Sequence, residues 1–252
     1  MRHLLSTVAF APVLLWQGRR VRAEVPRLPE AQGERSGIAG TGPVLRLLIV
    51  GDSAAAGVGV ATQAQALSGG LVSSLSDSFE LHWKLLATTG HATAEAIADL
   101  HAMDATPYDI VVTSLGVNDV TASHSLTKWR VDQKALIALL QSRFAARHIF
   151  LSGLPPMHLF PALPQPLRWY IGSRAKQFDA ALRLLADTSP HCEYVPLNFI
   201  GLSEGEMASD GFHPGPAIYQ QWADEIARRI KAQHPLRHSR ESGNPEYRST
   251  RL

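Results

Sequence analysis

Four short polar segments of this chain carry groups that could together perform acyl transfer. They contain Ser53, Gly90, Asn118, and the closely spaced pair Asp210 and His213. A serine hydroxyl is a weak nucleophile unless a base takes its proton, and a histidine held by a carboxylate is such a base. A side-chain amide and close-lying backbone N–H groups can stabilise the oxygen that becomes negative. The set therefore predicts attack by a serine on a carbonyl carbon.

The elements that must position these groups alternate between two hydrophobic patterns. Short runs rich in apolar residues, typical of buried strands, occur at 45–50, 81–87, 108–115, 148–152 and 194–197. Helical patterns occur between and after them at 62–76, from 93 onward, 126–144, 167–188 and 216–233. Such alternation predicts an α/β fold: a three-layer, doubly wound parallel sheet with helices on both faces.

The carboxyl ends of parallel strands lie at one edge of a sheet, where such folds bind their ligands. Residues 51–54, 89–91 and 116–119 directly follow three of the expected strands, and 210–214 lies on the loop into the last helix. We therefore expect the four polar segments to meet at this edge. Thr93 is expected to cap the helix after the second strand, with Glu95 in its first turn.

The ordered set of segments resembles the SGNH subgroup of the GDSL-type esterases and lipases over about residues 45–232. The first segment reads Gly-Asp-Ser-Ala, the third Gly-Val-Asn-Asp, and the last Asp-Gly-Phe-His-Pro. The chain departs from the family in having Ala54 after the serine and a threonine where an asparagine usually accompanies the glycine of the second block. The resemblance implies a flavodoxin-like SGNH hydrolase fold.

The resemblance also assigns roles to individual residues. Ser53 is expected to be the nucleophile, His213 its base and Asp210 the acid that orients the histidine. The oxyanion hole would consist of the backbone N–H groups of Ser53 and Gly90 and the side-chain amide of Asn118. Asp52 and Asp119, which flank these groups, are read as structural hydrogen-bonding residues.

The expected function is that of a serine esterase that hydrolyses small carboxylic esters, acyl or lysophospholipid-like, through an acyl-enzyme on Ser53. No cofactor and no metal is expected. Carbohydrate O-deacetylation and thioester hydrolysis are alternatives within the same chemistry, and a membrane-associated ligand-binding module is the alternative outside enzymes. An α/β-hydrolase would need a Gly-x-Ser-x-Gly elbow, which the chain lacks.

The proline-rich segment 155–170 is long for a connection between a strand and a helix. It is interpreted as a wall or lid for an acyl chain, and the alternative is a rigid loop packed on the core. The candidate substrate-lining residues in it are Met157, Leu159, Phe160 and Trp169.

Composition limits the other functions that the chain could have. The length of 252 residues suits one main domain, and the single Cys192 excludes an internal disulfide framework. The net charge is +4 over residues 1–46, −7 over 47–227 and +5 over 228–252. The acidic middle argues against a nucleic-acid partner. Composition leaves the oligomeric state open.

The two ends are expected to lie outside the hydrolase domain, which is placed at 44–234. Residues 1–43 comprise an apolar segment, 4–16, and a linker, 26–43, while 235–252 is expected to be a disordered basic tail. The apolar segment is too short to span a bilayer as a helix. With the basic cluster Arg19, Arg20 and Arg22 after it, residues 4–22 are interpreted as a helix on a membrane surface, on the cytoplasmic side. Export after signal-peptide cleavage and a helix packed on the protein itself remain alternatives.

Overall fold

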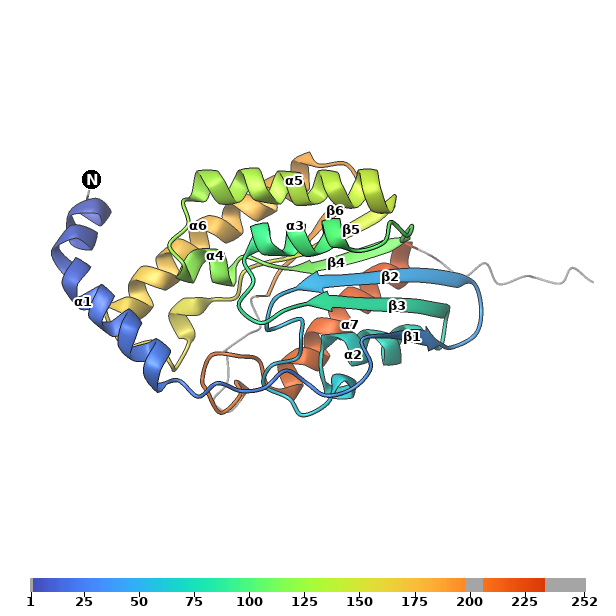
Figure 1. Ribbon diagram of the computed structural model, residues 1–252, viewed down its shortest axis with the longest axis horizontal. Helices are drawn as coiled ribbons and strands as arrows, with labels where there is room; N and C mark the ends of the chain where they lie inside the picture. Colours follow the sequence, from blue (N-terminus) through green and yellow to red (C-terminus); the bar gives the residue numbers. More distant parts are fainter. Residues whose placement is uncertain (1, 198–205, 234–252) are drawn as a thin grey trace, which may run out of the picture.

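The computed structural model describes residues 2–197 and 206–233, and in this part of the chain a six-stranded sheet lies between two layers of helices (Figure 1). The strands follow the order β1-β3-β2-β4-β5-β6 across the sheet. Every neighbouring pair is parallel except β1 and β3, which are antiparallel. Their bounds are Ser36–Ala39 (β1), Val44–Gly51 (β2), Glu80–Ala87 (β3), Ile110–Ser114 (β4), His148–Ser152 (β5) and Cys192–Val195 (β6).

The helices cover both faces of this sheet. Helices α2 and α7 pack together on one face, and α3, α5 and α6 pack side by side on the other (Figure 1). The described α-helices are α1 (Arg2–Glu24), α2 (Leu67–Leu75), α3 (Thr93–Ala102), α4 (Val117–Thr121), α5 (Leu126–Phe144), α6 (Leu167–Thr188) and α7 (Pro216–Gln233). Without β1, the strand order is that of the flavodoxin-like sheets. The predicted three-layer, doubly wound fold is confirmed.

The central strands are mostly apolar and buried because both of their faces are covered. Leu47 through Val50 of β2 are 0% exposed, and all five residues of β4 are buried. On one face, α7 contributes Tyr219 and Trp222, whose polar atoms both have partners. The Tyr219 hydroxyl donates to the carbonyl of Val58 at 2.7 Å, and Trp222 Nε1 donates to Ser152 Oγ at 3.2 Å. These bonds tie α7 to the ends of β2 and β5, where the polar segments lie.

Several expected elements differ in detail from the observed ones. The helical pattern at 62–76 is divided into a 3-10 turn, Gln63–Gln65, and α2. The prediction that Thr93 caps α3 is wrong, because Ala92 precedes the helix and Glu95 accepts a hydrogen bond from its N–H at 3.1 Å. The fifth expected strand, 194–197, begins two residues earlier, at Cys192.

The segment 26–43, expected to be a linker, is largely fixed to the domain. Its residues Ser36–Ala39 form β1, whose residue Ile38 is paired with His82 of β3. Upstream, the backbone N–H of Gln32 donates to Ala61 at 3.0 Å, and Gln63 donates back to Gln32 at 2.7 Å. This glycine-rich segment has no alternating apolar pattern, so its sequence does not predict a strand. An exposed edge strand such as β1 can form without that pattern, because neither of its faces is buried. The expected tail, 235–252, lies outside the described residues.

The N-terminal segment forms α1, and its second half is docked on α6. Leu14 is 7% exposed and Gln17 only 8%. The Gln17 amide donates to the carbonyl of Gln165 at 2.7 Å and accepts from the N–H of Leu167 at 3.0 Å. A buried amide with both ends satisfied fixes the register of α1 on α6. No described helix is long and apolar enough to cross a membrane.

Candidate active site

Ser53 lies in a tight turn directly after β2. The carboxylate of Asp52 closes the turn by accepting a hydrogen bond from the N–H of Ala54 at 3.1 Å. Gly51 has no room for a side chain, because a Cβ there would lie 2.4 Å from the Cβ of Ala55. The glycine therefore lets the chain fold back closely and present the Ser53 hydroxyl at the carboxyl edge of the sheet.

His213 lies on the loop into α7 and reaches Ser53 across this edge. Its Nε2 is 2.9 Å from Ser53 Oγ, and its Nδ1 is 2.6 Å from Asp210 Oδ2. A carboxylate can only accept hydrogen bonds, so the proton of a neutral His213 ring lies on Nδ1 and Nε2 accepts from the serine. The structure thus brings together the serine, histidine and aspartate predicted from the sequence, in a continuous hydrogen-bonded chain.

Asp210 is held as a carboxylate by its own turn. It is 5% exposed, and burial alone would raise its pKa, but the hydrogen bonds that it accepts outweigh burial and place the pKa below its usual value. Besides the His213 ring, the backbone N–H groups of Phe212 and His213 donate to Oδ1 at 2.9 and 3.0 Å. Asp210 therefore carries the charge that an imidazolium at His213 needs.

Aromatic rings hold the imidazole from the side. The Phe212 ring meets the His213 ring edge to face with 5.3 Å between centroids, and Phe160 meets Phe212 in the same way at 5.3 Å. These contacts restrict rotation of the His213 ring about its side-chain bonds. The orientation of the base therefore depends on packing as well as on Asp210.

Asn118, on α4, lies beside the turn that carries Ser53. Its Nδ2 donates to the carbonyl of His91 at 2.9 Å and to Asp52 Oδ2 at 3.3 Å. These two bonds link three of the predicted segments, since His91 follows Gly90 and Asp52 precedes Ser53. Both amide hydrogens have acceptors within the protein. Any further acceptor at this amide would have to displace one of these bonds, and the longer bond to Asp52 is the weaker of the two.

Gly90 lies in the exposed turn after β3. Its φ is +88°, while a Cβ there would meet no atom within 4 Å, so backbone conformation and not space requires the glycine. The turn is held by Glu30, whose Oε1 accepts from the N–H and the hydroxyl of Thr89 at 2.8 and 2.6 Å. The segment before β2 thus fixes the residue next to Gly90.

Asp52 is the most perturbed carboxyl group at this edge. It is 2% exposed, and burial, with a smaller contribution from the nearby Asp119, raises its pKa to about 7. Its hydrogen bond from Ala54 and the proximity of His213 act in the opposite direction. Asp119 itself points away from the serine and accepts from the Thr93 hydroxyl at 2.9 Å. Both aspartates therefore act as acceptors that hold loops together.

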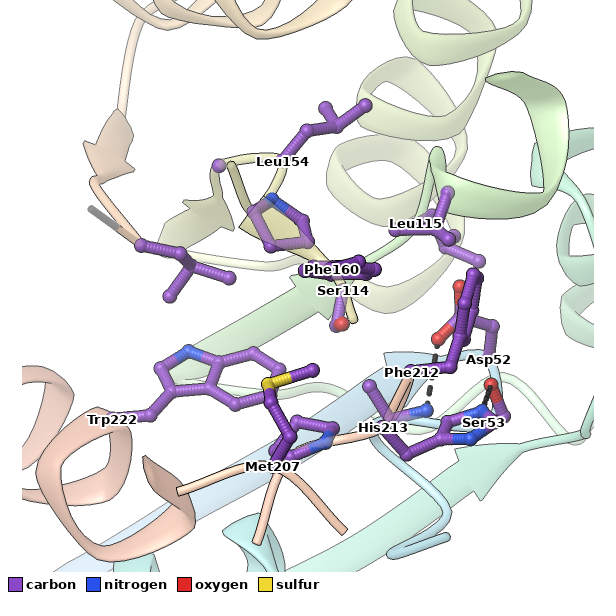
Figure 2. Close-up of a pocket in the computed structure, with 16 residues that line it drawn as sticks. Asp52, Ser53, Ser114, Leu115, Leu154, Phe160, Met207, Phe212, His213 and Trp222 are labelled. Atoms are coloured by element: carbon purple, nitrogen blue, oxygen red, sulfur yellow. Dashed lines mark hydrogen bonds between the residues drawn. The ribbon is translucent and has the colours of Figure 1, made fainter. Parts of the chain in front are cut away.

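An enclosed pocket of about 40 Å³ opens beside Ser53 and His213. Figure 2 shows Trp222 on the side opposite these two residues, with Leu154 and Phe160 between them. A single water needs roughly 10–15 Å³ by this measure. The pocket therefore has room for a group of only a few atoms, such as a short acyl group.

The four expected substrate-lining residues lie in different surroundings. Phe160 lines the pocket. Met157 is 0% exposed and belongs to the core, and Leu159 is 38% exposed at the surface. Trp169 lies on α6 and is not among the residues that line this pocket. The helical turn at Met157–Leu159 separates these side chains, because successive residues of a 3-10 turn point in different directions.

Sequence reasoning missed three contributors to the site. Glu30 was part of the expected linker, and nothing in its local pattern indicates a role. Leu154 and Trp222 line the pocket, but the sequence pattern around each of them indicates an ordinary core residue, Leu154 just after β5 and Trp222 within α7. Within the described ranges, no cluster of three or more His, Cys, Asp or Glu side chains could hold a metal ion.

A serine that is hydrogen-bonded to a histidine, which is in turn hydrogen-bonded to a buried carboxylate, can carry out acyl transfer. The family model of the GDSL-like lipase/acylhydrolase family matches residues 49–221, which include all the residues of this chain of hydrogen bonds. The protein belongs to this family. It is a serine esterase, a hydrolase of carboxylic esters, as the resemblance of its polar segments implied.

Solved structures with the same fold include other hydrolases. The protein TesA is 23% identical, with a TM-score of 0.56 over 74% of this chain and 98% of that one. A carbohydrate acetylesterase family member from Sinorhizobium meliloti is 18% identical, with a TM-score of 0.57 over 75% and 98%. The psychrotrophic esterase EstA from Pseudoalteromonas sp. is 19% identical, with a TM-score of 0.58 over 75% and 98%. At these identities the likeness establishes only the fold of this GDSL-like esterase, and not its substrate. No curated protein matches the chain.

Proposed function

We propose that Ser53 is the nucleophile of this GDSL-like esterase and that the hydrolysis proceeds through an acyl-enzyme. Ser53 Oγ attacks the ester carbonyl carbon while its proton passes to His213 Nε2, and Asp210 stabilises the resulting imidazolium. Collapse of the tetrahedral intermediate expels the alcohol, which takes the proton from His213. Water then attacks the acyl-enzyme while His213 accepts its proton. The carboxylic acid is released, and the Ser53 hydroxyl is regenerated. The distance of 2.9 Å between Nε2 and Oγ is the observation that carries this proposal.

The oxyanion would be stabilised by the N–H groups of Ser53 and Gly90 and by the amide of Asn118. The bonds from Asn118 to His91 and Asp52 support this role, because they hold the amide next to the serine turn. In the transition state the substrate oxygen accepts the hydrogen bond that Asn118 Nδ2 now donates to Asp52 at 3.3 Å. The gain is largest in the transition state, where that oxygen carries a negative charge.

The substrates are proposed to be acyl esters of small molecules, including lysophospholipid-like esters. A second candidate activity is removal of acetyl groups from carbohydrates, which the small volume of the enclosed pocket favours. Thioesters undergo the same chemistry, but no feature of the pocket distinguishes them.

Covalent labelling tests the nucleophile. A fluorophosphonate should modify Ser53 in active protein, because the probe reacts with serines that a neighbouring base activates. Intact-mass measurement and peptide mapping would show one adduct on the peptide that contains Ser53 and none in Ser53→Ala. An adduct that persists in Ser53→Ala, together with retained p-nitrophenyl acetate hydrolysis, would assign the nucleophile to another residue.

We also propose that α1 attaches the esterase to a membrane surface, on the cytoplasmic side. Support comes from four apolar side chains that α1 leaves exposed next to a basic cluster: Phe10 at 44%, Val13 at 41%, Leu15 at 65% and Trp16 at 57%. The buried Gln17 supports retention of α1 over export, since cleavage near residues 17–24 would remove the α1–α6 contact. The native protein should pellet with vesicles that contain anionic phospholipid and keep an unprocessed N-terminus. A mature chain that begins near residues 17–24 would establish export.

A further inference from the structure

A second, much larger cavity lies next to the site, between α1 and the start of α6. This groove has a volume of about 700 Å³, and its apolar lining includes Leu14, Leu15, Val21, Leu163, Leu167 and Ile171. Asn118 and Phe212 also line it. Asn118 is linked to the turn of Ser53, and Phe212 contacts the ring of His213. The groove therefore ends at residues that contact the turn of Ser53 and the ring of His213.

The two cavities can hold very different parts of an ester. The enclosed pocket at Ser53 measures about 40 Å³, so an alkyl chain of more than a few carbons cannot enter it. The groove is more than ten times larger and falls within the range of ligand-binding cavities, which are apolar with a few polar groups. A long chain on the substrate must therefore lie in the groove.

Helix α1 forms the outer wall of this groove. The lining residues on α1 extend from Ala11 to Arg22, a distance of about 17 Å at 1.5 Å per residue. This is close to half of the roughly 30 Å hydrocarbon core of a bilayer, which is the length of one layer of acyl chains. The wall is anchored, because Gln17 bonds to both Gln165 and Leu167 at the start of α6.

The polar groups of the groove lie where a substrate's polar end could meet water. Arg19 and Arg22 line it, and the Arg22 guanidinium donates to the carbonyl of Thr121 at 3.4 Å. Arginine stems can cover apolar surface while their charged ends stay solvated. The groove thus offers an apolar path bordered by positive charge.

We propose that the α1–α6 groove binds the long alkyl chain of the ester substrate, with α1 as its outer wall. The proposal rests on the esterase activity at Ser53 and adds to it a chain-length preference. This alkyl chain belongs to the acyl group or to the alcohol, since either arrangement places the ester carbonyl carbon at Ser53. Helix α1 precedes the residues that the family model matches, so this preference comes from a part of the chain outside the family's common domain.

Gly18 allows the groove to be filled from α1 itself. It lines the groove, and a Cβ added there would meet no atom within 4 Å. Gly18→Phe therefore places a ring in the groove without a backbone clash, and any residue other than proline favours a helix more than glycine does. Ala23→Phe is the matched control, because Ala23 is exposed on the same helix and does not line the groove.

The experiment compares two matched pairs of esters on the full chain: p-nitrophenyl acetate with p-nitrophenyl dodecanoate, and ethyl acetate with dodecyl acetate. In the native protein, the long ester of one pair should be hydrolysed with a higher kcat/KM than its short partner. Gly18→Phe should lower this long-to-short ratio by at least about tenfold, the effect of losing the burial of two methylene groups. Ala23→Phe should keep the native ratio.

The long ester whose hydrolysis falls in Gly18→Phe identifies the source of the alkyl chain. A loss with the dodecanoate indicates an acyl chain, and a loss with dodecyl acetate indicates the chain of the alcohol. An unchanged ratio in Gly18→Phe, an equal loss in Ala23→Phe, or no preference for either long ester in the native protein would overturn the groove proposal. These outcomes leave the proposed function intact as long as acetate hydrolysis depends on Ser53. Acetate hydrolysis that persists in Ser53→Ala would instead overturn the proposed function.

Discussion

The two halves of the active site are built in different ways. In the half proposed to handle the proton, Asp210 and His213 lie three residues apart. Hydrogen bonds of 2.6 and 2.9 Å connect Asp210 to His213 and His213 to Ser53. In the half that would stabilise the oxyanion, the amide of Asn118 is engaged with His91 and Asp52, and the turn of Gly90 is exposed. The first half is assembled before substrate binds, whereas the second must exchange a hydrogen bond with the substrate.

Because of this difference, different substitutions should impair each half. The proton half is specified by one short turn, so its defects come from the residues of that turn. The oxyanion half draws on loops after β2, β3 and β4 and on Glu30 from the segment before β2. Its performance should therefore depend on residues that never touch the substrate.

The largest effect is expected in the proton half. Asp210→Asn removes the charge that stabilises the imidazolium and reverses one hydrogen bond, so kcat on p-nitrophenyl acetate should fall by on the order of 10³. The loss should stay below the about 10⁴ known for a serine protease triad, because Phe212 also restrains the His213 ring. Circular dichroism would confirm that the variant is folded.

Asp119→Asn is the control for this change. Asp119 is 0% exposed and accepts from Thr93 and His124, away from the serine. Its replacement should lower the free energy of unfolding by about 1–3 kcal/mol and leave kcat nearly unchanged. If the folded Asp119→Asn enzyme loses more turnover than Asp210→Asn, the assigned acid is the wrong carboxylate.

A smaller loss is expected in the oxyanion half. Asn118→Ala removes one donor and should lower kcat by about 10², the lower end of the range for a single donor, since the backbone N–H groups of Ser53 and Gly90 remain. KM should change little, because the bond to the substrate forms mainly in the transition state. Steady-state kinetics decide the matter, and a loss below about fivefold would assign Asn118 to the turn alone.

The support of the Gly90 turn should matter less again. Glu30→Ala releases the N–H and hydroxyl of Thr89, so kcat should fall by up to about tenfold, well under the roughly 10² that a displaced catalytic group can cost. Glu34→Ala is the matched control, since Glu34 is an exposed carboxylate of the same segment. Equal rates for the two variants would show that Glu30 does not position the turn.

The last prediction concerns stability and not turnover. Burial raises the pKa of Asp52 to about 7, from an ordinary value of 3.8. Between these values the folded protein holds a proton that the unfolded chain releases, so the free energy of unfolding should fall as pH rises through this window. In Asp52→Asn this contribution is absent, and the stability difference from the native protein should shift in favour of the variant between pH 4 and pH 7. Urea unfolding at several pH values measures the slope, to which a constant offset from lost hydrogen bonds does not contribute.

Local sequence patterns predicted most of the helices and strands and the pairing of Asp210 with His213. The bounds of α5, α6, α7 and β5 agree with the expected ranges, because long apolar patterns and buried runs are local signals. Asp210 and His213 are separated by one turn of chain, so their pairing needs little tertiary information. Ser53 and Asn118 follow buried strands, and the parallel sheet brings strand ends to one edge wherever the strands are placed.

Tertiary structure alone decided the features that depend on distant partners. Strand β1 exists because β3 offers it an edge, not because Ser36–Ala39 has a strand pattern. Helix α1 forms one wall of a groove because Gln17 meets the start of α6, 150 residues later in the chain. Met157 is buried and Phe160 lines the pocket because of the direction in which a short turn points each side chain. Local pattern records the character of a residue, but which surface that residue meets is set by contacts that close only when the whole sheet is assembled.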